Sequence, residues 1–144
     1  MLLRDILRAK GEKVFTVPAD AKLSEVVRLL VQHNVGSLVV TDGDQLVGII
    51  TERDILRTMA ELADRIDDVA IRSRMTTGII SGAPSDDIND IMRLMTDKRI
   101  RHLPVLEKGK LAGLVSIGDI VKAEHELLTM EKEYLIKYIQ SPGR

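Results

Sequence analysis

The chain aligns with itself at one constant shift of 65 residues, and the alignment needs no gap. The shift carries Leu38 onto Leu103, Gly48 onto Gly113 and Asp54 onto Asp119. A unit that occurs twice, at a spacing beyond the roughly 20–50 residues of solenoid repeats, indicates two small subdomains that share one interface. We therefore expect any ligand of this chain to bind between the two copies.

Each copy shows the same order of local signals. A short leading strand precedes a helix whose apolar residues recur at helical spacing from Leu23 or Ile88, two strands joined by a short turn follow, and a second helix starts at Thr51 or Ser116. The predicted strands are residues 14–17, 37–40 and 46–50 in the first copy and 79–81, 102–105 and 111–115 in the second. The pattern predicts an α/β (α+β) fold of two tandem β-α-β-β-α units.

Two segments lie outside the repeat. We divide the chain into a first unit at residues 1–62, a charged connector at 63–70, a second unit at 71–124 and a C-terminal helical extension at 125–144. Apolar residues at spacings of three and four extend the last helix to about Ile139. This stripe can pack on its own core or pair with another subunit. We favour a homodimer, because each copy already has two helices to cover its small sheet.

Composition excludes several classes of function. The 21 Lys and Arg residues are balanced by 22 Asp and Glu residues, and aromatic residues are scarce, which argues against nucleic acid as a partner. The absence of cysteine excludes disulfides and thiolate metal sites and suits a reducing compartment. No histidine lies in a metal-binding motif, and no apolar run is long enough to span a membrane. We expect a soluble cytoplasmic protein without a metal site or membrane association.

A hydroxyl and a carboxylate recur where each second strand gives way to its helix. The residues are Thr51 and Asp54 in the first copy and Ser116 and Asp119 in the second. One interpretation is a capping box, in which the hydroxyl and the acid satisfy backbone amides at the helix start. The other is a nucleotide site, in which the helix start binds phosphate and the carboxylate accepts hydrogen bonds from a ribose. The local spacing alone leaves both interpretations open.

The doubled pattern Gly-apolar-apolar-Ser/Thr-x-x-Asp, at the end of a strand-helix-strand-strand-helix unit, resembles the cystathionine β-synthase-type (CBS) domain pair, also called the Bateman module. The resemblance covers residues from about 6 to 123, and its nearest counterparts are stand-alone bacterial CBS-pair proteins. It implies two CBS subdomains related by pseudo-two-fold symmetry. It also implies an adenosine-containing ligand in the cleft between the CBS motifs: AMP first, with ADP, ATP, NAD(H) or S-adenosylmethionine as alternatives, and no catalytic cofactor.

The resemblance also assigns residues to two sites. Asp54 and Asp119 correspond to the acids that bind ribose in this family, and Thr51 and Ser116 to the hydroxyls before them. The opposite copy is expected to supply the other wall of each site. For Asp54 these residues are Met75, Gly78, Ile80, Ile100, Arg101 and His102, with Arg53 nearby; for Asp119 they are Lys13, Phe15, Val35, Gly36 and Ser37. Arg101 and His102 are expected to face phosphate, or else to be a solvated strand edge.

The sequence therefore predicts a regulatory module that senses adenine nucleotides and signals energy or redox state to a downstream protein it does not identify. An enzyme is the weaker alternative, because no histidine or lysine lies at catalytic spacing from either aspartate. A structural dimerisation module with degenerate sites and an S-adenosylmethionine sensor are further alternatives.

Overall fold

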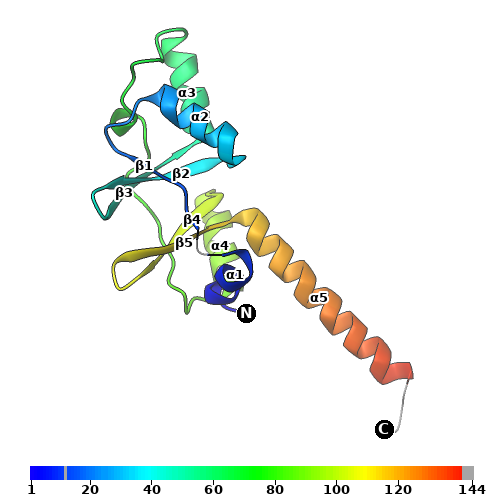
Figure 1. The fold of residues 1–144 in the computed structure, drawn as a ribbon. Helices are drawn as coiled ribbons and strands as arrows, with labels where there is room; N and C mark the ends of the chain where they lie inside the picture. Colours follow the sequence, from blue (N-terminus) through cyan, green and yellow to red (C-terminus); the bar gives the residue numbers. More distant parts are fainter. Residues whose placement is uncertain (12, 141–144) are drawn as a thin grey trace.

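The two predicted hairpins lie at the centre of the two copies in the computed structural model, which describes residues 1–11 and 13–140 (Figure 1). Strand β2 (Ser37–Asp42) pairs antiparallel with β3 (Gln45–Thr51), and β4 (His102–Glu107) pairs antiparallel with β5 (Lys110–Ser116). Each hairpin has one register shift, after Val40 and after Val105. These positions are related by the 65-residue shift, so the copies repeat even their irregularities.

Helices flank the two sheets as the periodicity predicts. In the first copy, α2 (Leu23–His33) precedes the hairpin and α3 (Glu52–Leu62) follows it. In the second copy, α4 (Ile88–Lys98) and α5 (Ile117–Gln140) hold the equivalent places. Helices α2 and α4 turn their apolar stripes to the cores, since their buried residues recur at spacings of three and four. The predicted fold class is confirmed.

The leading strand of the second copy is a wrong prediction. Strand β1 (Thr16–Pro18) pairs in parallel with β2, but residues 79–81 form no strand, and one bridge from Gly82 to Val105 takes its place. The amide of Val39 donates to the carbonyl of Phe15 over 3.2 Å in the first copy. The 65-residue shift replaces Val39 by Pro104, which has no N–H, so this ladder bond cannot form in the second copy.

An N-terminal helix that the periodicity analysis missed packs on the opposite copy. Helix α1 (Leu3–Lys10) lies against β5 and α5. Its apolar side chains enter the core of the second copy, whereas Ile71, in a short 3₁₀ turn (Ile71–Ser73), enters the core of the first. The 65-residue shift relates Ile6 to Ile71. The segment before the first copy therefore packs in the core of the second, and the segment before the second copy packs in the core of the first.

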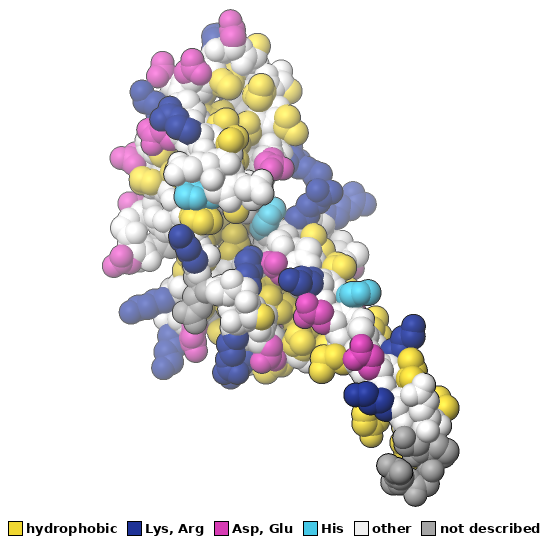
Figure 2. Space-filling view, turned by 45° about the vertical axis from the view of Figure 1, so that its right-hand side comes forward, with side chains coloured by type: hydrophobic (Ala, Val, Ile, Leu, Met, Phe, Trp, Pro, Cys, Tyr) yellow, Lys and Arg dark blue, Asp and Glu magenta, His cyan; other side chains and the backbone are white. Residues whose placement is uncertain are grey.

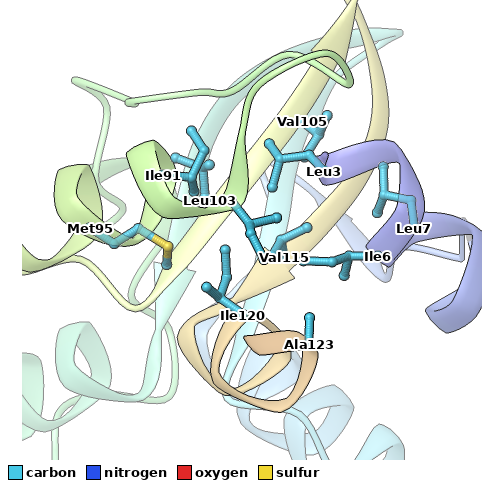
Figure 3. Close-up of a cluster of buried hydrophobic side chains, with 11 residues drawn as sticks. Leu3, Ile6, Leu7, Ile91, Met95, Leu103, Val105, Val115, Ile120 and Ala123 are labelled. Atoms are coloured by element: carbon cyan, nitrogen blue, oxygen red, sulfur yellow. The ribbon is translucent and has the colours of Figure 1, made fainter. Parts of the chain in front are cut away.

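The core of the second copy shows this exchange directly. Leu3, Ile6 and Leu7 of α1 meet side chains of α4, β4, β5 and α5 (Figure 3). Backbone hydrogen bonds also join these segments, since the amide of Ile88, the first residue of α4, donates to the carbonyl of Met1 over 3.0 Å. In the first copy the amide of Leu23 donates to Val69 over 2.8 Å. The two copies therefore fold as one interlocked unit.

The second half of α5 leaves the body of the molecule and projects into solvent (Figure 1). Its last buried residue is Ala123, and large apolar side chains beyond it are more than half exposed. They are Leu128, Met130, Tyr134, Leu135, Tyr138 and Ile139. The helix continues to Gln140 as predicted, while residues 141–144 of the predicted extension lie outside the described residues.

Candidate functional site

A groove of about 900 Å³ lies between the two copies. The start of α3 forms one wall, and the end of α4 with the residues that lead into β4 forms the opposite wall. The lining residues are Gly36, Ile49, Thr51, Glu52, Arg53, Asp54, Leu56, Arg57, Thr76, Gly78, Ile79, Ile80, Met95, Thr96, Arg99, Ile100, Arg101, His102 and Ile117. Both copies therefore contribute to one site.

Asp54 lies at the first turn of α3 and is almost buried, with 8% of its surface exposed. Its Oδ2 accepts hydrogen bonds from the amide of Thr51 over 2.9 Å and from the hydroxyl of Thr51 over 3.1 Å. The Thr51 hydroxyl in turn accepts a bond from the amide of Asp54 over 3.3 Å. This is a capping box, and within the described residues its side-chain bonds involve Oδ2 alone. Oδ1 therefore remains for a ligand in the groove.

Four arginines give the groove a positive balance. Arg53 and Arg57 come from α3, and Arg99 and Arg101 come from the opposite wall. Two carboxylates, Glu52 and Asp54, line the same groove. Figure 2 shows Lys and Arg side chains gathered at the edge of the notch between the first copy, at the top, and the second copy below it. A cleft lined by one dominant sign of charge concentrates counter-ions, so this groove favours an anionic ligand.

His102 joins this wall from the start of β4. Burial is the main cause that lowers the pKa of His102 below 6.5, and the ammonium of Lys10 and the guanidinium of Arg101 lower it further. The carboxylates of Glu52 and Asp119 raise it and offset part of the shift. A neutral imidazole can donate one hydrogen bond and accept another, so it can contact a hydroxyl or a phosphate without adding charge.

The carboxylate of Asp119 has a different environment from that of Asp54. Its Oδ2 accepts a bond from the amide of Ser116 over 2.9 Å, and the Ser116 hydroxyl accepts one from the amide of Asp119 over 3.1 Å. The ammonium of Lys10 also donates to this Oδ2, over 2.6 Å. Partial burial raises the pKa of Asp119, but the bonds from Lys10 and Ser116 outweigh burial and lower it overall.

A sequence model of the CBS domain matches residues 3–61 and 66–126 and so covers both copies. The chain belongs to the CBS-domain family. The mitochondrial CBS domain-containing protein CBSX3 of Arabidopsis thaliana is 36% identical over 147 aligned positions, which cover 96% of this chain and 71% of that protein.

Solved structures show the same architecture. The CBS-domain containing protein ATU1752 of Agrobacterium tumefaciens superposes with a TM-score of 0.84 at 36% identity, over 86% of this chain and 99% of that one. The CBS domain pair of protein MJ0100, solved in complex with 5′-methylthioadenosine and S-adenosyl-L-methionine, superposes with a TM-score of 0.78 at 25% identity. That match covers 88% of this chain and 97% of the solved CBS domain pair.

The CBS pair brings most residues predicted for the Asp54 site together in the groove. Those that line it are Thr51, Arg53, Asp54, Gly78, Ile80, Ile100, Arg101 and His102. Met75 does not line it, because its sulfur packs against Gly48, 2.6 Å from where a Cβ would lie, and borders the first core. Gly36 was assigned to the Asp119 side but lines the Asp54 groove, where Glu52 Oε1 lies 3.4 Å from the position of its absent Cβ.

The remaining residues predicted around Asp119 are largely engaged within the chain. Ser37 is buried at the start of β2, and Val35 packs against the first core. The ring of Phe15 stacks on His33 with 3.8 Å between ring centroids. Lys13 Nζ lies 5.2 Å from the centroid of the Phe15 ring.

The sequence analysis missed several lining residues of the CBS pair. Arg57 could have been found, because it follows Arg53 by four residues and shares its helix face. Arg99 gave no local signal, since it ends α4 in the left-handed conformation at φ 54°. Glu52, Thr76, Ile79, Met95 and Thr96 enter the groove only through the packing of the two copies.

The described residues offer no cluster of three or more His, Cys, Asp or Glu side chains that could hold a metal ion. Among the helices of residues 1–11 and 13–140, none is long and apolar enough to cross a membrane.

Proposed function

We propose that this CBS pair is a regulatory module that binds an adenine nucleotide in the groove at Asp54, with AMP as the first candidate and ADP, ATP and NAD(H) as alternatives. The observation that carries the proposal is one groove in which a carboxylate with a free oxygen stands beside four arginines. The carboxylate suits a ribose diol, and the arginines suit phosphate. The complex of MJ0100 with adenosine-containing ligands supports the same ligand class.

The conformation of Arg99 adds support for a phosphorylated ligand. Arg99 and Asn34 occupy equivalent helix ends, and both adopt the left-handed conformation, at φ 54° and φ 52°. Asparagine tolerates this region, whereas a longer side chain is strained there by about 1 kcal/mol. Backbone strain of this kind occurs often at functional positions. The proposal assigns Arg99, with Arg53, Arg57 and Arg101, to the phosphate end of the groove.

The charge of the groove also bears on S-adenosylmethionine as the alternative ligand. That molecule carries a sulfonium and an ammonium, and four arginines disfavour added positive charge. AMP carries negative charge on its phosphate and has no cationic group. The proposal therefore ranks AMP above S-adenosylmethionine for this chain, although the CBS domain pair of MJ0100 was solved with S-adenosyl-L-methionine.

Calorimetric titration of the full chain with AMP, ATP, NAD, S-adenosylmethionine and adenosine tests this function. We expect AMP to bind more tightly than adenosine, and the difference to shrink as salt is raised, because surface charge interactions are screened. A thermal shift under the same conditions gives an independent readout, since a ligand of the native state raises its stability. If none of these ligands binds, the groove is degenerate and the structural alternative stands.

We also propose that the chain is a homodimer formed through the exposed end of α5. Leu128, Tyr134, Leu135 and Tyr138 would otherwise present a continuous apolar face to water. Light scattering on the full chain and on a chain ending at Ala123 tests this assembly. We expect a dimer that becomes a monomer on truncation, whereas a full-length monomer at high micromolar concentration would refute it. Cytoplasmic location and the downstream partner stay predictions.

A further inference from the structure

Lys10 occupies the carboxylate that the second copy would offer to a nucleotide. Its ammonium donates to Asp119 Oδ2 over 2.6 Å and to the carbonyl of Leu114 over 2.8 Å. Lys10 ends α1, whose Leu3, Ile6 and Leu7 are anchored in the core of the second copy. The backbone of Lys10 is therefore held in place by a packed helix, from which its side chain, 37% exposed, reaches Asp119.

The first copy has no such cation at the equivalent position. The 65-residue shift places Met75 where Lys10 stands, and Met75 packs its neutral thioether against Gly48. Within the described residues, the side-chain bonds of Asp54 come from Thr51 alone, whereas those of Asp119 include the lysine. The exchange of Lys10 for Met75 thus gives the two aspartates different charged surroundings.

A second contact involves another residue predicted for the Asp119 site. Phe15 is the aromatic residue that the second site would use against an adenine ring, and His33 stacks on it with 3.8 Å between centroids and 11° between ring planes. This spacing and angle are those of two stacked aromatic rings. His33 therefore covers one face of the Phe15 ring.

We propose that the chain closes the site of its second copy with its own side chains, Lys10 on the Asp119 carboxylate and His33 on the Phe15 ring, so that each chain binds one nucleotide, at Asp54. The inference rests on the proposed function for the identity of the ligand. Asp119 Oδ2 accepts from both Lys10 and Ser116, so a ribose that binds this carboxylate competes with an ammonium that already neutralises its charge, which reduces its affinity about tenfold or more.

The test is the number of AMP molecules bound per chain, measured by calorimetry or equilibrium dialysis on the full protein. The variant is Lys10→Met, which copies the residue of the first repeat. Lys22→Met is the matched control, since it breaks an exposed ion pair with Asp68 of 3.2 Å away from both sites. We expect one AMP for the wild type and the control, and a second binding event for Lys10→Met or for Lys10→Met combined with His33→Ala.

Adding Asp119→Asn to the opened variant should remove the second event. Two AMP molecules on the wild-type chain, or one on both opened variants, would overturn the inference. If the wild type binds no adenosine ligand, the proposed function is wrong, but the closure by Lys10 and His33 can still be judged. A binding site that appears in an opened variant would then support the closure, and the absence of such a site would refute the closure. A titration of the Asp119 carboxyl by NMR without nucleotide gives a further check, because Lys10→Met should raise its midpoint.

Discussion

Replacement of Asp54 by alanine separates the two roles that the structure gives this carboxylate. The side chain caps α3 through Oδ2, and Oδ1 remains for the ribose. A hydrogen bond to a charged group contributes about 1.5–3 kcal/mol, so loss of the ribose contact should weaken AMP binding about 10- to 150-fold. Loss of the cap should reduce the free energy of unfolding by about 1 kcal/mol.

Asp5 provides a matched control for the capping role. Its Oδ2 accepts the amide of Leu2 over 2.9 Å, the same distance at which Asp54 Oδ2 accepts the amide of Thr51. Asp5→Ala should therefore lower stability by a similar amount, yet it should leave AMP affinity within about twofold, since α1 does not line the groove at Asp54.

Calorimetry with AMP and 2′-deoxy-AMP is the deciding assay. The wild type should prefer AMP, and Asp54→Ala should bind both ligands equally weakly, because the preference depends on the carboxylate. The reasoning is refuted if Asp54→Ala retains the preference for AMP, or if Asp5→Ala weakens AMP as much as Asp54→Ala does.

Three further outcomes follow from the packing and the charges. Arg101→Ala should weaken AMP about three- to tenfold more than adenosine in calorimetry, because a partly exposed guanidinium acts on the phosphate; equal losses would indicate a defect of the fold. Leu3→Ala should cost about 2–5 kcal/mol in urea denaturation, since Leu3 is fully buried in the second core; a loss below 1 kcal/mol would show that α1 is not part of it. The free energy of unfolding should rise with pH between the lowered pKa of folded His102 and about 6.5, and it should level off above that pH. The reason is that the unfolded chain binds one more proton than the folded chain in this pH range. His102→Gln should remove this rise, and Lys10→Met should raise the His102 pKa in an NMR titration.

Much of the fold was predictable because its signals are local. The spacing of apolar residues defined α2, α4 and the length of α5, and short turns defined both hairpins. The capping boxes at Thr51 and Ser116 follow from residues three positions apart. The sequence also contained the reason why residues 79–81 form no strand, since Pro104 lacks the amide that Val39 uses to bond β1.

The candidate site was predictable only in part. Thr51, Asp54 and the wall at Ile100, Arg101 and His102 followed from the repeat and its resemblance, and these residues come together in the groove, whereas Ser116 and Asp119 do not line it. Arg99 was missed because it enters the groove through the end of a helix from the other copy. Met75 was misplaced because it packs against Gly48, and no local pattern indicates that contact.

What the sequence determined by itself is the repeated unit: its elements, their order, and a carboxylate at each helix start, because each depends on residues within a few positions of one another. What only the tertiary structure decided is the exchange between the copies. Lys10 meets Asp119 across 109 residues of chain, and α1 enters the core of the second copy, so the two equivalent aspartates acquire different surroundings. Such contacts depend on how two packed surfaces dock, and that is a property of the whole fold rather than of any segment.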